Sequence, residues 1–177
     1  AELVTAMEGL RNGDPTDPQV QVGPVIDAAA AERITDWVAD ATGRGARLLT
    51  GGTAVGTLMA PTLLADLPAE SIIANNEVFG PVLTVTTYET IEEAFAKVNS
   101  SRYGLQAGVF TTSITTAFAA HRGLEVGGVV IGDVPTFRAD QMPYGGWKAS
   151  GTGREGVASA MDDLTDARVL VLTGLPL

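Results

Sequence analysis

The sequence predicts an α/β fold in which a mostly parallel sheet is covered by helices on both faces. Between Val82 and Ile131, segments rich in β-branched residues alternate with segments whose apolar residues recur at helical spacing. Parallel strands need a crossover about as long as a helix, so this alternation favours parallel pairing. The chain has 177 residues, of which 45% are hydrophobic, and this is enough for a compact core.

The first third of the chain is predicted to contain one long helix and one short strand. Residues 12–26 are rich in Asn-Gly, Asp-Pro and Gly-Pro pairs, which favour turns. From Asp27 onward, apolar residues recur at helical spacing, namely Ile34, Trp37, Val38 and Ala41. Gly43 or Gly45 is expected to end this helix, before a strand at residues 47–49.

The rest of the chain is predicted to alternate strands with helices. Thr90 and Glu93 form a capping-box pattern, in which the Thr90 hydroxyl accepts from the Glu93 amide and the Glu93 carboxylate reaches back. The expected elements in chain order are a strand at 82–88, a helix starting at Thr90, a strand at 106–110, a helix at 113–122, a strand at 128–131, a helix at 157–161 and a strand at 168–172.

The last of these strands is apolar on both faces after Arg168. A strand of that kind needs a partner, either in the same sheet or on another subunit. No linker, internal repeat or low-complexity tract divides the preceding residues. We therefore expect residues 1–167 to form one domain.

Composition excludes several classes of function. The formal net charge is −10 and the basic residues are dispersed, which argues against a nucleic-acid partner. The apolar runs are too short for a membrane span, and no secretory signal pattern is present, so a cytoplasmic location is expected. With no cysteine and one histidine, His121, neither a metal site nor a cysteine or serine nucleophile is predicted. His121 is interpreted as a helix-end residue without a catalytic role.

Two motifs are candidates for cofactor binding. Residues 151–156 match G-x-G-x-x-G, but a polar loop precedes them and no acidic residue follows about twenty positions on, so a turn is favoured over a dinucleotide fingerprint. Glu77 offers two acceptor oxygens that suit paired ribose hydroxyls, and Phe79 could flank an attached ring. Taken without other information, a surface glutamate and a core phenylalanine would be the commoner interpretation.

Residues 76–82, Asn-Glu-Val-Phe-Gly-Pro-Val, and residues 143–151, Pro-Tyr-Gly-Gly-Trp-Lys-Ala-Ser-Gly, resemble two signatures of the aldehyde dehydrogenase superfamily. This resemblance covers nearly the whole chain and reverses the interpretation of the first motif. It implies NAD or NADP as cofactor, with Glu77 on the nicotinamide ribose and Phe79 at the nicotinamide site. It also implies a small-molecule aldehyde as substrate.

The resemblance further implies an aldehyde pocket built from Thr136, Phe137, Arg138 and Tyr144. Arg138 could pair with an anionic or hydroxylated substrate through its planar donor fork, or it could be a structural arginine that bonds loop carbonyls. The residues around this loop look most like members that act on lactaldehyde, semialdehydes or glyceraldehyde 3-phosphate.

In this family a cysteine thiolate attacks the aldehyde, hydride passes to the cofactor and a glutamate-activated water hydrolyses the thioester. Those groups precede Ala1 in the family's order, so no catalytic residue is assigned to this chain, and the chain alone is predicted to produce no NADH from an aldehyde. Residues 1–167 would be the later part of the catalytic domain. Residues 168–177 would start a C-terminal interface strand of a homo-oligomer, either a dimer or a tetramer.

An alternative function remains open. The chain could be a non-catalytic protein with a truncated dehydrogenase fold, acting as a binding or assembly partner. The same apolar residues 168–172 would then serve association rather than catalysis.

Overall fold

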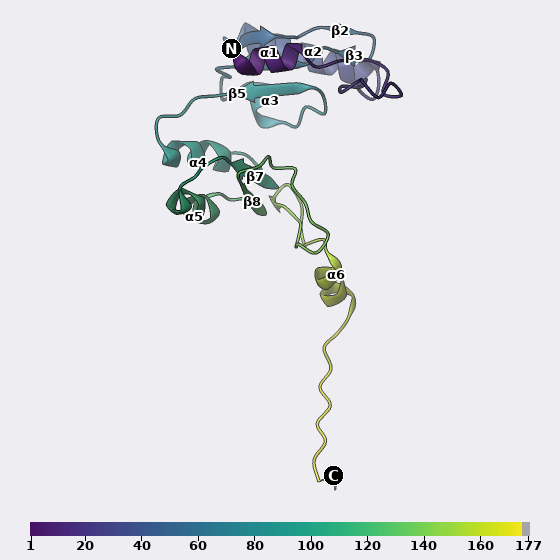
Figure 1. The fold of residues 1–177 in the computed structure, drawn as a ribbon, viewed down its shortest axis with the longest axis vertical. Coiled ribbons are helices and arrows are strands. Elements are labelled where there is room, and N and C mark those ends of the chain that lie inside the picture. The colour runs from purple at the N-terminus through teal and green to yellow at the C-terminus, as the bar shows by residue number, and fades with distance from the viewer. Residues whose placement is uncertain (175–177) are drawn as a thin grey trace. The chain divides into compact units, whose positions relative to one another are not determined.

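The computed structural model describes residues 1–174 of the chain, which divides into two compact units, Ala1–Tyr88 and Glu89–Leu177. The boundary lies inside the predicted run of alternating strands and helices, where no division was expected from the sequence. Figure 1 shows the helices and strands along the chain, most of them labelled.

The first unit is built on a three-stranded sheet with the order β1-β4-β5. The β1 and β4 strands run antiparallel, and β4 and β5 run parallel with Thr62 opposite Val82. A two-residue hairpin, β2–β3, lies outside this sheet. The elements are α1 (Glu2–Glu8), α2 (Ala28–Gly43), β1 (Arg47–Thr50), β2 (Ala54–Val55), β3 (Leu58–Met59), β4 (Thr62–Ala65), α3 (Ile72–Asn75) and β5 (Val82–Val85).

The core of this unit lies between α2 and β4. The Asp27 carboxylate caps α2 by accepting from the Ala30 amide at 2.7 Å, and the helix ends at Gly43 as predicted. The inward face of α2 buries three of the four residues that the helical spacing selected, together with two alanines at the start of the helix, so the buried set is Ala30, Ala31, Ile34, Val38 and Ala41. The fourth selected residue, Trp37, is only partly buried. All four residues of β4 are buried, which makes it the central strand of the sheet.

The second unit contains a β-α-β crossover. The β7 and β8 strands pair in parallel with Gln106 opposite Gly128, and α5 connects them. The short β6 and β9 strands pair antiparallel, with Tyr103 opposite Lys148. The elements are α4 (Ile91–Asn99), β6 (Tyr103–Gly104), β7 (Gln106–Val109), α5 (Ile114–Gly123), β8 (Gly128–Ile131), β9 (Trp147–Lys148) and α6 (Val157–Leu164).

The α/β class is confirmed, with parallel pairing at β4–β5 and at β7–β8. These two pairs belong to separate sheets, since β5 is an edge strand of the β1-β4-β5 sheet in the first unit and β7 pairs with β8 in the second. The predicted order of strands and helices from residue 82 to residue 131 is therefore correct. The single sheet expected from it is not present among the described residues.

The capping box of α4 forms as predicted and has one further contact. The Thr90 hydroxyl accepts from the Glu93 amide at 3.2 Å, and the Glu93 carboxylate reaches back to the Thr90 backbone. The Glu93 carboxylate also accepts from the Glu89 amide at 2.8 Å, one residue before the N-cap. This hydrogen bond, together with the bond from the Lys97 ammonium, lowers the pKa of the Glu93 carboxyl below its usual range.

The strand predicted at residues 168–172 is not formed, and residues 165–174 contain no strand at all. The side chains of Val169 to Leu172 are between 67% and 85% exposed. An interface strand at this place stays a prediction, and residues 175–177 of that predicted segment lie outside the described residues. Among the described residues, no helix has both the length and the apolar character needed to cross a bilayer.

Candidate functional site

The Glu77–Phe79 segment of the first unit projects two side chains outward and one inward. Glu77 is exposed and Phe79 is 78% exposed, so the interpretation of Phe79 as a core residue is wrong. Val78 between them packs against both hydrophobic clusters of this unit. Val78 therefore lies inward while its two neighbours are exposed to solvent.

A side chain from α2 fixes the backbone of this segment. The Arg33 guanidinium donates to the Val78 carbonyl at 2.8 Å and lies over the Trp37 ring, 4.6 Å from its centroid. Gly80 is packed so closely that a Cβ atom there would lie 2.5 Å from Cδ1 of Ile34. The next residue, Pro81, accepts from the Thr62 amide at 2.8 Å at the start of the parallel β4–β5 pair.

These contacts hold Phe79 in the left-handed region, with a φ of 53°. Its ring stands beside an open pocket of about 580 Å³, which residues 21–26 line from the other side together with Gly80 and Pro81. The exposed carboxylate of Glu77 offers acceptor oxygens and no donor when it is ionised. The segment is thus a rigid support for one carboxylate and one aromatic ring.

The second unit carries the four residues predicted to form an aldehyde pocket. The loop that holds Thr136, Phe137 and Arg138 follows β8, and the backbone turns at Gly132, which has a φ of 81°. Phe137 lines a pocket of about 500 Å³ together with Gln106, Asp133, Met142 and the strand residues 128–131. Thr136 and Arg138 are exposed beside it.

Arg138 and Tyr144 are brought together by Glu155. The Arg138 guanidinium lies 3.0 Å from the Glu155 carboxylate and 4.7 Å from the centroid of the Tyr144 ring. Tyr144 and Glu155 also exchange two backbone hydrogen bonds, at 3.0 and 2.6 Å. These contacts favour the structural interpretation of the arginine, although its partners are a carboxylate and a ring rather than the expected loop carbonyls. A contact with substrate stays a prediction.

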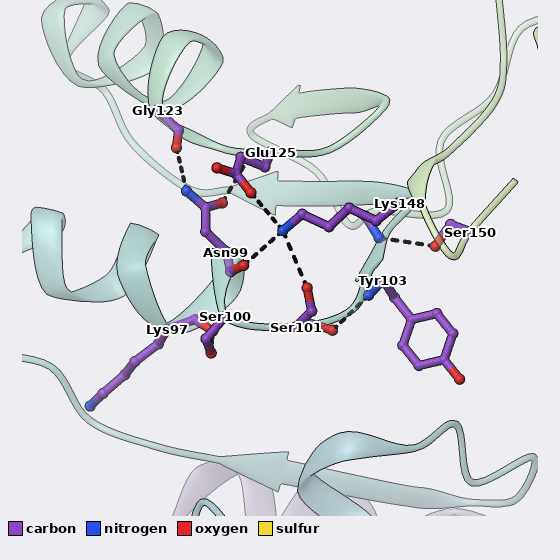
Figure 2. A network of polar contacts seen from close by, with 10 residues as sticks. Lys97, Asn99, Ser100, Ser101, Tyr103, Gly123, Glu125, Lys148 and Ser150 are labelled. Atoms are coloured by element: carbon purple, nitrogen blue, oxygen red, sulfur yellow. Dashed lines mark hydrogen bonds and ion pairs between the residues drawn. The ribbon is translucent and has the colours of Figure 1, made fainter. Parts of the chain in front are cut away.

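Lys148, the lysine of the second motif, connects three segments of the unit (Figure 2). Its ammonium lies 2.7 Å from the Glu125 carboxylate, 2.7 Å from the Asn99 carbonyl and 3.2 Å from the Ser101 carbonyl. The Asn99 side chain itself donates to the Gly123 carbonyl and accepts from the Glu125 amide. We call this set of contacts, centred on Lys148, Asn99 and Glu125, the lysine network.

Two further hydrogen bonds fix the residues that follow Lys148 in the motif at residues 143–151. The Ser150 hydroxyl accepts from the Gly104 amide at 3.0 Å, and the Ala149 amide donates to the Arg102 carbonyl at 3.0 Å. The lysine network and these two bonds hold residues 148–150, which follow Tyr144 in the same segment. No role for this lysine was predicted from the sequence.

The glycine-rich run at residues 151–156 forms a turn, as predicted. It follows β9, a strand of two exposed residues, and precedes α6, a helix that is eight residues long. Gly151, Gly153 and Gly156 all have positive φ values. A dinucleotide fingerprint needs a buried strand before it, and the described residues provide none there.

Sequence reasoning missed two residues that position the candidate site, Arg33 and Gln106. Arg33 lies four residues before Trp37 on one helix, a spacing at which a stacked pair could have been expected. Gln106 is a polar residue at the start of an otherwise small and apolar strand, but its partners lie about thirty residues away and no local pattern marks them. Among the described residues, no group of three His, Cys, Asp or Glu side chains could hold a metal ion.

Comparison with known proteins gives a consistent result. Residues 1–170 match the family model described as Aldehyde dehydrogenase family. The chain is 42% identical over 171 residues to 3-sulfolactaldehyde dehydrogenase from Priestia aryabhattai, a match that covers 97% of this chain and 36% of that protein. It is 37% identical over 171 residues to lactaldehyde dehydrogenase from Methanococcus aeolicus, covering 97% of this chain and 37% of the relative.

Solved structures agree with the sequence relatives. Aldehyde dehydrogenase 21 from Physcomitrella patens, in complex with the reaction product succinate, superposes with a TM-score of 0.92 at 43% identity, covering 96% of this chain and 35% of that one. Glyceraldehyde-3-phosphate dehydrogenase from Methanocaldococcus jannaschii, complexed with NADP, gives a TM-score of 0.87 at 38% identity, covering 93% and 36%. The chain thus spans a little over a third of the length of the relatives it matches.

Proposed function

The chain belongs to the aldehyde dehydrogenase family, and from this premise we propose that it forms part of an NAD(P)⁺-dependent enzyme that oxidises an aldehyde to a carboxylic acid. The observation that carries the proposal is the fixed outward projection of Glu77 and Phe79 on either side of a buried Val78. An exposed carboxylate and an exposed ring on a rigid support have no evident role in the stability of this unit.

These two residues fit a nicotinamide cofactor. The carboxylate of Glu77 would accept hydrogen bonds from the two hydroxyls of a ribose, and the ring of Phe79 would lie against the nicotinamide. The bound cofactor would supply the hydride acceptor. The contribution of this chain would be to hold the ribose and to present one face of the nicotinamide in a fixed position.

The aldehyde would meet the loop at residues 134–138. Two of the relatives are dehydrogenases of lactaldehyde and 3-sulfolactaldehyde, which favours a small aldehyde with a hydroxyl or anionic substituent. Arg138 has five N–H donors, and its Nη2 atom lies 3.0 Å from the Glu155 carboxylate. The other donors could bind such a substituent, while Phe137, Thr136 and Tyr144 would shape the pocket.

The covalent step would use groups outside these 177 residues. The family chemistry requires a cysteine thiolate, and this sequence contains no cysteine. We propose that the rest of a longer polypeptide supplies the thiolate, the activating glutamate and most of the nucleotide-binding surface. A cytoplasmic location, expected from the sequence, is part of the same proposal.

We also propose that residues 168–172 serve a subunit interface. Val169 to Leu172 are exposed, apolar and without a strand partner among the described residues, and exposed apolar strands favour pairing with another chain. Val171→Asp should shift the assembly toward the monomer, as measured by analytical ultracentrifugation. The matched change Thr165→Asp on the exposed end of α6 should leave the mass unchanged.

The substitution Glu77→Gln tests the cofactor assignment in the complete enzyme. Loss of the charge should raise the KM for the coenzyme about tenfold, because hydrogen bonds to a carboxylate are worth about 1.5–3 kcal/mol. The KM for the aldehyde should change little. Glu32→Gln is the control, since it makes the same change at an exposed position on α2. Equal coenzyme KM values for Glu77→Gln and Glu32→Gln would contradict the assignment.

A further inference from the structure

We infer that Gln106 is a positioning residue that fixes the loop at residues 134–138 on the face of β7, and so sets the shape of the candidate aldehyde pocket. This inference rests on the proposed function for its consequence, but its geometry stands on contacts within the second unit. Gln106 itself is not assigned a contact with substrate or cofactor.

A single side-chain amide holds two carbonyl groups of the loop. The Nε2 atom of Gln106 donates to the Pro135 carbonyl at 3.2 Å and to the Phe137 carbonyl at 3.1 Å. These two carbonyls lie on either side of Thr136, so the backbone of that residue is held from both ends. The strand therefore controls the direction in which Thr136 and Phe137 project.

The face of β7 is shaped to receive the loop. Gly108 lies two residues after Gln106, on the same face of the strand. A Cβ atom at Gly108 would lie 2.5 Å from the Asp133 carbonyl oxygen and 3.1 Å from Cδ of Pro135. The loop backbone thus packs directly against β7 at Gly108. Two residues earlier on the same face, the Gln106 side chain is hydrogen-bonded to the loop.

The neighbouring strand holds the amide in one orientation. A Cβ atom at Gly128, the register partner of Gln106 on β8, would lie 3.1 Å from Oε1 and 3.3 Å from Cγ of Gln106. Oε1 is buried and has no hydrogen-bond partner. Rotating the amide by half a turn would place this oxygen against two carbonyl oxygens, which would be repulsive, so Nε2 must face the loop.

The position of the loop is therefore sensitive to the chemistry of residue 106 and not only to its size. Gln106→Leu keeps most of the volume but leaves both carbonyls without a donor. Gln106→Glu keeps the shape and places a carboxylate against the same two carbonyls. The second change should free the loop more than the first.

Hydrogen exchange of residues 133–138 in the 177-residue chain tests this geometry. In Gln106→Leu we expect exchange to be about tenfold faster than in the unchanged chain, and faster still in Gln106→Glu, since each lost hydrogen bond lowers the free energy of local opening. Gln141→Leu and Gln141→Glu are matched controls at an exposed glutamine nearby and should leave the rates unchanged. Unchanged exchange at α4, in the same unit as Gln106, would show that the variants are folded.

The complete enzyme gives the second readout. Gln106→Leu should raise the KM for the aldehyde about fivefold while kcat and the KM for the coenzyme stay within about twofold, because the loop is removed from the thiolate chemistry. Exchange that is equal in the Gln106 and Gln141 variants would overturn the inference. Faster exchange with an unchanged aldehyde KM would overturn the assignment of the loop to the aldehyde, and this role of Gln106 with it, but would leave the assignment of Glu77 intact.

Discussion

Replacing Gly127 by alanine is expected to destabilise the Glu89–Leu177 unit by about 3 kcal/mol, the upper end for overpacking a closely packed site. A Cβ atom at this position would lie 1.7 Å from the carbonyl oxygen of Gly145 and 3.1 Å from that of Leu105. Both neighbours are backbone atoms, so no side chain can move aside. The Gly127 amide also donates to the Gly104 carbonyl at 3.0 Å, which prevents the strand from withdrawing.

Urea unfolding followed by Trp147 fluorescence measures this effect, in a Trp37→Phe background that leaves one tryptophan. Gly127 does not have a positive φ, so the alanine variant tests the close approach alone and not backbone strain. Gly43→Ala is the control, because a Cβ at the end of α2 meets nothing within 4 Å. Trp37 in a Trp147→Phe background should report equal or slightly greater stability for that variant. An unchanged midpoint for Gly127→Ala would contradict the packing of the Tyr144–Ser150 segment against β8.

Those parts of the fold that depend on local signals could be predicted from the sequence. The spacing of Ile34, Trp37, Val38 and Ala41 predicted α2, because a helix is specified by residues within a few positions of one another. The β7–α5–β8 crossover was predicted for the same reason, since each of its elements has its own periodicity and turn residues.

Pairings between distant residues could not be predicted in this way. The two-residue β6 and β9 strands contain no alternation to detect, and they are joined across more than forty residues. The parallel pairing of β5 with β4, with Thr62 opposite Val82, likewise joins residues that no local pattern connects.

The candidate site likewise combines residues that the sequence identified with contacts between distant residues that it did not. The family resemblance selected Glu77 and Phe79, and the structure adds the reason that they project, namely the hold of Arg33 on Val78. For Arg138, the sequence left open a structural role or a substrate role, and the pairing with Glu155 supports the structural one while leaving donors for a substrate. No local pattern in the sequence marks the role of Gln106, because its side chain donates to two carbonyl groups about thirty residues away.

Replacing Lys148 by methionine is expected to destabilise the same unit by about 2 kcal/mol, since hydrogen bonds that involve a charged donor are worth about 1.5–3 kcal/mol and the acceptors are left without this partner. Methionine keeps much of the length of the side chain and removes the ammonium that joins Glu125, Asn99 and Ser101. The Lys148 side chain is 26% exposed and the Glu125 side chain is 53% exposed, so the expected loss rests mainly on the hydrogen bonds to the two carbonyl groups rather than on the ion pair.

The matched control for this change is Lys97→Met in the same unit. Lys97 pairs with Glu93 at 2.8 Å across one turn of α4, but its side chain is 43% exposed, and such helix pairs are worth about 0.3–0.5 kcal/mol. Trp147, which adjoins Lys148 on β9, should report a clear loss of stability for Lys148→Met and a small one for Lys97→Met. Equal losses would mean that the lysine network is no more than a surface ion pair. A larger loss at Lys148, with faster hydrogen exchange at Tyr144 and Glu155, would mean that the motif lysine holds the segment to which Arg138 is tied.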